Sequence, residues 1–221
     1  MKTKLVLLGL GSRTTSFYLT ALNSLYNQEK GGYSTCPLVL VNTDFNTINS
    51  LLPNTSEQLD FAVSQYTDEI ETLNFQHLLI PNITLHATID RLKINTKVLH
   101  PVCLSIKAIN DRHWGKVVLF GSLFSMTSSY IKEQFIANGI EVILPSQDDM
   151  TFIDVVRQRI YNETDTEELI ESYHSIINKY TENTPVVLSC TELSILKPKG
   201  NKNLLDMAQV QLEEAIKHIS L

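Results

Sequence analysis

Short continuous runs of apolar residues alternate along this chain with longer segments of helical periodicity. Unbroken apolar runs are typical of parallel strands that are covered on both faces. The predicted strands are Leu5–Leu10, Leu38–Asn42, His77–Ile80, Lys97–Leu99, Lys116–Phe120, Glu141–Leu144 and Pro185–Ser189. The predicted helices are Thr15–Tyr26, Ser56–Leu73, Val102–Arg112, Met126–Asn138, Asp149–Ile160, Thr166–Tyr180 and Met207–Ile219. The pattern predicts an α/β fold with helices on both sides of parallel sheets.

The two halves of the chain follow one plan. A strand ends in Gly9-Leu10-Gly11-Ser12 before a helix, and about 110 residues later another strand ends in Gly121-Ser122 before a helix. Similarly, one strand leads into Pro81-Asn82-Ile83-Thr84, and its counterpart leads into Cys190-Thr191-Glu192. We therefore expect two similar α/β units, residues 1–98 with 206–221 and residues 99–205. The site is expected in the cleft between them.

Composition narrows the class of protein. A formal charge of −6 and a pI near 5.5 argue against a broad nucleic-acid surface. No segment approaches the roughly 20 apolar residues that a membrane helix needs. Three widely spaced cysteines argue against a disulfide framework or a zinc site, so we expect a cytoplasmic protein with reduced thiols.

Cys190 is the strongest chemical candidate. It stands where a buried apolar run stops and a helix is predicted to begin, so helix amides and the helix dipole would favour its thiolate. The alternative is a small packed cysteine without chemistry. Cys103, in an apolar helix, is expected to be a core residue, and Cys36, just before Pro37, is expected to be structural.

Five motifs, in order, resemble those of the aspartate/glutamate racemase superfamily of cofactor-independent enzymes. They are Gly9-Leu10-Gly11-Ser12-Arg13-Thr14-Thr15, Asn42-Thr43-Asp44-Phe45, Pro81-Asn82-Ile83-Thr84-Leu85-His86, the segment from Gly121-Ser122 to Thr127 and Tyr130, and Ser189-Cys190-Thr191-Glu192. The resemblance implies a pseudo-duplicated fold, no cofactor, no metal and a small amino acid or dicarboxylate as substrate. It also implies a homodimer that binds neither nucleic acid nor membrane.

In such enzymes two cysteines act on opposite faces of the substrate α-carbon, one removing the proton and the other returning it. Here the first cysteine position is Asn82, and the family's next residue, Asn, is Ile83. An amide has no usable pKa, so Asn82 can hydrogen-bond but cannot exchange a proton. His86 is the nearest other acid by sequence, although it could simply hydrogen-bond the loop.

The candidate catalytic residues are Cys190 and Asn82. Donors around a substrate carboxylate would stabilise the carbanion. The candidate binding residues are Gly11, Ser12, Arg13, Thr14, Thr15, Asn42, Asp44, Ile83, Thr84, Ser122, Ser125, Thr127, Thr191 and Glu192. Thr84 and Thr191 could also be helix N-caps, Asn82 a turn residue, and Glu192 either a cap or a partner of the thiol.

Three functions are consistent with these residues. The first is a racemase-like isomerase that moves an α-proton through Cys190. The second is a one-thiol decarboxylase or lyase of the same fold. The third is a non-catalytic carboxylate-binding relative. The missing cysteine argues against two-thiol racemisation but does not separate the other two.

Overall fold

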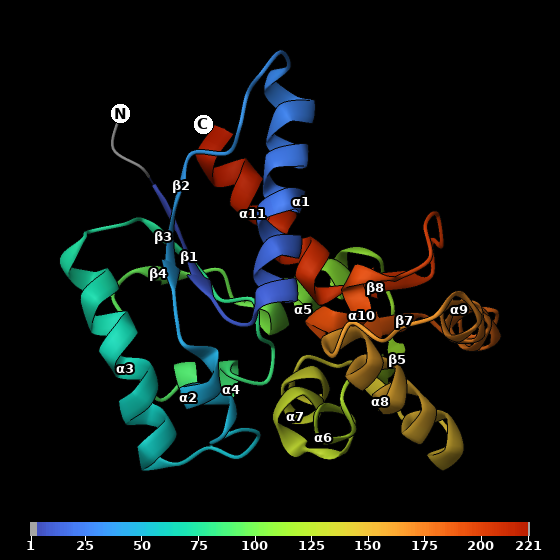
Figure 1. Ribbon diagram of the computed structural model, residues 1–221. Coiled ribbons are helices and arrows are strands. Elements are labelled where there is room, and N and C mark those ends of the chain that lie inside the picture. The colour runs from blue at the N-terminus through green and yellow to red at the C-terminus, as the bar shows by residue number, and fades with distance from the viewer. Residues whose placement is uncertain (1–3, 221) are drawn as a thin grey trace. The chain divides into compact units, whose positions relative to one another are not determined.

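The computed structural model describes residues 4–220 of the 221-residue chain. Its strands are β1 Leu5–Gly9, β2 Leu38–Asn42, β3 His77–Leu79, β4 Lys97–Val98, β5 Lys116–Phe120, β6 Glu141–Ile143, β7 Val186–Leu188 and β8 Leu204–Asp206. Its helices are α1 Ser12–Lys30, α2 Phe45–Asn49, α3 Glu57–Thr72, α4 His86–Ile89, α5 Pro101–Asp111, α6 Leu123–Thr127, α7 Ser129–Ala137, α8 Gln147–Tyr161, α9 Glu167–Thr181, α10 Thr191–Ile195 and α11 Met207–Ser220 (Figure 1).

The described residues form two compact units. Unit 1 comprises residues 4–100 with 211–220, and unit 2 comprises Pro101–Val210. The predicted first domain also includes residues 1–3 and 221, which lie outside the described residues.

Each unit contains one four-stranded parallel sheet, and the two sheets have the same topology. The strand order is β2-β1-β3-β4 in unit 1 and β6-β5-β7-β8 in unit 2. When the strands of each unit are numbered along the chain, both sheets have the strand order 2-1-3-4. The prediction of two similar parallel α/β units is confirmed.

Unit 1 is built around its central strand, β1, which is fully buried. Val6 and Leu8 of β1 join Leu59 and Val63 of α3 in one apolar cluster. The other face of the sheet is covered by α1 and the C-terminal part of α11 (Figure 1). Those two helices are joined by a buried hydrogen bond of 2.7 Å, in which the Tyr18 hydroxyl donates to the Gln211 side-chain oxygen.

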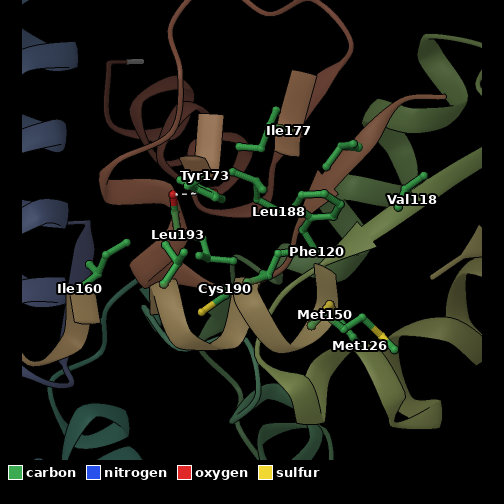
Figure 2. Close-up of a cluster of buried hydrophobic side chains, with 13 residues drawn as sticks. Val118, Phe120, Met126, Met150, Ile160, Tyr173, Ile177, Leu188, Cys190 and Leu193 are labelled. Carbon is green, nitrogen blue, oxygen red and sulfur yellow. Dashed lines mark hydrogen bonds between the residues drawn. The ribbon is translucent and has the colours of Figure 1, made fainter. Parts of the chain in front are cut away.

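Unit 2 packs its main apolar cluster against β5 and β7 (Figure 2). Three helices, α8, α9 and α10, contribute to this cluster, and Cys190 is one of its members. Tyr173 of α9 is fully buried, and its hydroxyl donates to the backbone oxygen of Leu193 at 3.1 Å. This bond fixes α10, which directly follows Cys190, to the body of the unit.

The sequence-based elements differ from the structure where segments are short. The helix predicted over Met126–Asn138 is two helices, α6 and α7, because Ser128 adopts an extended conformation between them. The sequence analysis predicted no residue range for strand β8 or for the one-turn helices α2, α4 and α10. Among the residues that the structure describes, no helix is both long and apolar enough to cross a membrane.

Parallel pairing places the candidate loops at the carboxyl ends of neighbouring strands. In unit 1, β1 pairs with β3, so the loop after Gly9 and the loop after Leu79 leave the same sheet edge. In unit 2, β5 pairs with β7 through Phe120 and Leu188, which places the loops at Gly121 and Ser189 side by side. This edge is where parallel α/β sheets bind ligands.

Candidate active site

Cys190 lies two residues beyond the last residue of β7 and is the N-cap residue of α10. It is 7% exposed. Its thiol donates a hydrogen bond to Oε2 of Glu192 at 2.9 Å, so the sulfur has a carboxylate base in direct contact. Glu192 was expected either to cap the helix or to be a partner of the thiol, and this contact supports the second role.

The prediction of a favoured thiolate at Cys190 is wrong for this structure. Burial, followed by the charge and hydrogen bond of Glu192, raises the pKa of the Cys190 thiol well above its usual value. Arg157 and the Leu193 N–H lower it, but by less. The physical reason is that α10 has only five residues, so its dipole is weak compared with desolvation beside a carboxylate. The sulfur is therefore a protonated thiol hydrogen-bonded to its base.

The loop after β5 lies directly beside the Cys190 loop. A Cβ atom added at Gly121 would lie 2.4 Å from Oγ of Ser189 and 3.0 Å from Cβ of Ser125. Ser122 caps α6, with its hydroxyl 3.1 Å from the Ser125 N–H and 2.8 Å from the Ser125 hydroxyl. Thr127 is exposed and donates its hydroxyl to the Leu123 carbonyl oxygen, so its side chain is used within α6.

Two charged residues of α8, Asp154 and Arg157, belong to this region but were missed by the sequence analysis. One carboxylate oxygen of Asp154 accepts from the Leu123 N–H at 3.0 Å and from Nε of Arg157 at 2.9 Å. The Asp–Arg spacing of three residues on one helix was the only available signal. Nothing in the sequence indicated that α8 packs against α10.

In unit 1, the first motif forms the start of α1. Gly11 is the N-cap with a φ of 77°, a left-handed conformation that glycine adopts without strain. The N–H of Thr15 donates to the Gly11 carbonyl oxygen at 3.0 Å. Ser12 is exposed and Arg13 is partly buried, whereas Thr14 and Thr15 are 4% and 7% exposed. The Thr15 hydroxyl oxygen is buried and has no hydrogen-bond partner among the described residues.

The second motif follows β2 and is tied to the end of β1. Thr43 donates its backbone N–H and its hydroxyl to the Gly9 carbonyl oxygen, at 3.1 and 2.8 Å. Asn42 is exposed and pairs with Gly9 in the sheet register. Asp44 caps α2 by accepting from the Asn46 N–H at 3.2 Å. Asn42 and Asp44 are therefore brought to the same sheet edge as the start of α1.

Asn82 occupies a tight turn after β3. Its carboxamide oxygen accepts from the Leu85 N–H at 3.0 Å, and its side chain is partly exposed. Within residues 4–220, the carboxamide oxygen and the backbone oxygen of Asn82 are therefore both used inside the turn. The next residue, Ile83, is 3% exposed and belongs to the apolar core.

Neither threonine of these turns is a helix N-cap. The N-cap residues are Leu85 for α4 and Cys190 for α10, and neither makes a side-chain capping bond. Each helix starts one residue away from the position that the sequence suggested. Thr84 is partly buried and Thr191 is 3% exposed.

His86 holds the Asn82 turn rather than carrying a mobile proton. Its Nδ1 lies 2.9 Å from the Asn82 carbonyl oxygen, and because that oxygen only accepts, Nδ1 carries the proton. Burial, and then the nearby His100, lower the pKa of His86 to about 3. The ring is neutral at physiological pH, so it is a poor source of a second proton.

The remaining cysteines differ in burial. Cys36 is 8% exposed, as expected of a structural residue, and burial raises its pKa to about 11. The prediction that Cys103 is a core residue is wrong, because its side chain is exposed. The buried face of α5 instead includes Val102, Ser105 and Ile109. In residues 4–220, no group of three or more His, Cys, Asp or Glu side chains is arranged to hold a metal ion.

Comparison with known proteins identifies relatives of the whole chain. A family model described as Asp/Glu/hydantoin racemase matches residues 7–215. Two solved structures share the fold: an aspartate racemase homologue from Pyrococcus horikoshii (TM-score 0.82, 20% identity, 100% of each chain covered) and an aspartate racemase from Picrophilus torridus (TM-score 0.80, 17% identity, covering 100% of this chain and 95% of that one).

A more distant match is a maleate isomerase from Pseudomonas putida, with a TM-score of 0.53 and 10% identity over 98% of this chain and 92% of that one. The search of curated protein sequences found no match. At these identities the structural matches report the fold alone.

Proposed function

Because this chain belongs to the Asp/Glu/hydantoin racemase family, we propose that it is a cofactor-independent isomerase that moves the α-proton of a small amino or carboxylic acid through Cys190. The observation that carries the proposal is the 2.9 Å hydrogen bond from the Cys190 thiol to Glu192. A thiol that already shares its proton with a carboxylate has the two groups that general acid–base catalysis needs.

The proton transfers follow from that pair. The thiol proton passes to Oε2 of Glu192, which leaves a thiolate on Cys190. The thiolate removes the α-proton of the substrate and becomes a thiol again, while the electrons of the C–H bond form an enediolate on the substrate carboxylate. The Cys190 thiol then returns a proton to the α-carbon and becomes a thiolate, and Glu192 gives its proton back to the sulfur, which restores the substrate acid, the thiol and the carboxylate.

The developing enediolate needs hydrogen-bond donors. The hydroxyls of Ser122 and Ser125 lie on the loop beside Ser189, and Thr191 directly follows Cys190. Preorganised donors of this kind are worth about 10²–10³-fold in rate when one is removed. We propose Ser122, Ser125 and Thr191 as these donors.

Asn82 limits what this chemistry can produce. Its carboxamide can donate to a substrate oxygen, but it cannot exchange a proton, and the neutral His86 beside it does not replace a cysteine. These two observations support a second candidate, a decarboxylase or lyase in which one thiol protonates one face of an enediolate.

The test is α-proton exchange in deuterated water. The protein is incubated with a panel of amino and dicarboxylic acids, and exchange is followed by NMR together with optical rotation and loss of carboxylate. We expect exchange with the wild type, none with Cys190→Ser, and wild-type exchange with the matched control Cys103→Ser. Loss of the substrate carboxylate without α-proton exchange would indicate the decarboxylase or lyase. A wild type that catalyses neither reaction would indicate a non-catalytic carboxylate-binding protein.

A further inference from the structure

Helix α8 forms one wall around the Cys190 thiol. Ile153, Val156 and Ile160 of α8 lie in the same buried cluster as Cys190. Figure 2 labels Ile160 and Cys190. Arg157 follows Val156 directly and is partly buried, with a side chain that is 26% exposed. By contrast, Arg159 of the same helix is on the exposed face. One arginine of α8 therefore borders the thiol environment and the other faces solvent.

Asp154 fixes Arg157 in this position. Its Oδ1 accepts from Nε of Arg157 at 2.9 Å and from the Leu123 N–H at 3.0 Å, and its Oδ2 accepts from Gln158 at 2.7 Å. These bonds, whose donors also lower the pKa of Asp154, keep it ionised although burial acts the other way. The same carboxylate thus anchors both the loop after β5 and the guanidinium.

The charge of Arg157 acts on Cys190 and Glu192. Although burial works to lower it, the pKa of Arg157 is raised by the Asp154 hydrogen bond and by interactions with Cys190, Asp154 and Glu192. Within residues 4–220, its recorded hydrogen bond and ion pair use Nε alone. On helix α8, Arg157 lies one turn from Ile153 and from Ile160, so it is on the face of α8 that packs in the Cys190 cluster.

Three other ionisable groups of unit 2 are near the thiol or on elements packed around it, namely Glu192, Tyr173 and Asp206. Glu192 accepts from the thiol itself. Tyr173 of α9 is fully buried, and burial raises its pKa well above the usual value, so it stays a neutral phenol. Asp206 of β8 forms an ion pair with Lys197, and Oδ1 of Asp206 accepts from Ser194 at 2.7 Å. Arg157, by contrast, is a cation whose charge lowers the pKa of the Cys190 thiol.

We propose that Arg157, held by Asp154, is the positioning residue that stabilises negative charge on the Cys190 sulfur during proton transfer. Glu192 and burial oppose a thiolate, and Arg157 offsets part of their effect. Helix α10 has only five residues, so its dipole is too weak to stabilise the thiolate. This assignment rests on the proposed function, because the thiolate that Arg157 stabilises is the form of Cys190 that proton abstraction requires.

The experiment measures the pH dependence of Cys190 alkylation by iodoacetamide in a Cys36→Ala/Cys103→Ser background. Arg157→Gln should slow alkylation about tenfold at a fixed, mildly alkaline pH and move the inflection to higher pH. Arg157→Lys, which keeps the charge, should retain most of the rate. Arg159→Gln removes the same charge from the exposed face of the same helix and should leave the profile unchanged.

Two results would overturn the assignment. The first is an equal alkylation profile for Arg157→Gln and Arg159→Gln. The second is a shift in Arg157→Lys as large as that in Arg157→Gln, because a charge-independent shift would indicate a packing role for Arg157. Circular dichroism of each variant checks folding, and if Arg157→Gln is unfolded, the Arg157→Lys profile decides. Alkylation needs no substrate, so it tests Arg157 independently of the proposed function. If Arg157→Gln shifts the profile but the protein exchanges no α-proton, the proposed function is wrong and the effect of Arg157 on the thiol stands.

Discussion

Gly121→Ala probes whether the loop after β5 and the Cys190 loop are packed as tightly as their sequence positions suggest. The new Cβ would lie 2.4 Å from Oγ of Ser189 and 3.4 Å from its carbonyl oxygen, so one of the two loops must move. The serine cannot turn away without loss, because its hydroxyl donates to the Phe120 carbonyl oxygen at 2.9 Å in a buried position.

The cost follows from these contacts. Overpacking of a close-packed site costs about 1–3 kcal/mol, and losing the Ser189 hydrogen bond adds about 0.5–1.5 kcal/mol. Replacing glycine also stiffens the unfolded chain, which returns about 0.4–1 kcal/mol. The free energy of unfolding should therefore fall by about 0.5–4 kcal/mol. The matched control is Gly115→Ala, just before the same strand, where an added Cβ meets nothing within 4 Å.

Urea unfolding followed by far-ultraviolet circular dichroism gives both free energies. Adding Ser189→Ala to Gly121→Ala removes Oγ of Ser189, the atom nearest to the new Cβ. The free energy of unfolding of the double variant should therefore be at most about 1 kcal/mol below that of Ser189→Ala alone. The Phe120 carbonyl stays satisfied there by the Ser189 N–H at 2.7 Å. Equal stability of Gly121→Ala and Gly115→Ala would refute the packing argument, as would a double variant whose losses simply add.

Two further predictions concern titration and exposure. Iodoacetamide at neutral pH should label the exposed Cys103 before the buried, protonated Cys190, as peptide mass spectrometry will show; faster labelling of Cys190 would contradict the burial of its thiol. Burial, with His218, lowers the pKa of His77 to about 4, and burial lowers that of His86 to about 3, both below the ordinary 6.5. The unfolded chain thus binds more protons below about pH 6.5, so stability is intact above that pH and is lost progressively as pH falls from 6.5 to about 4 for His77 and to about 3 for His86. Urea unfolding at a series of pH values should show this loss, and His77→Gln should flatten its upper part.

The sheets were predictable because their strands are continuous apolar runs with helices between them. Leu5–Gly9 and Lys116–Phe120 have the predicted starts, since a buried parallel strand needs apolar residues at every position. Leu204–Asp206 was missed because three residues carry too little pattern. The helix break at Ser128 was missed because an extended serine inside an amphipathic segment leaves no periodic signal.

The chemistry of the site was only partly predictable. The motifs located Cys190 and Glu192 two residues apart, and the structure adds the hydrogen bond between them. The direction of the thiol pKa was not predictable, because it depends on burial against residues of α8 and α9, such as Ile153 and Tyr173, that are distant in sequence. Arg157 lies in no motif, and only the packing of α8 against α10 brings its charge to the thiol.

The most direct test of the central claim, that Cys190 is the proton-transferring group and Asn82 cannot be its counterpart, is the ratio of α-proton exchange to inversion. Both rates are measured on one amino or dicarboxylic acid in deuterated water, for the wild type and for Asn82→Cys. The account predicts that wild-type exchange exceeds inversion and that Asn82→Cys raises inversion by about 10²–10⁴-fold, the usual worth of one acid–base group. Racemisation of aspartate by the wild type at about 10 s⁻¹, the rate of a typical enzyme, would contradict it.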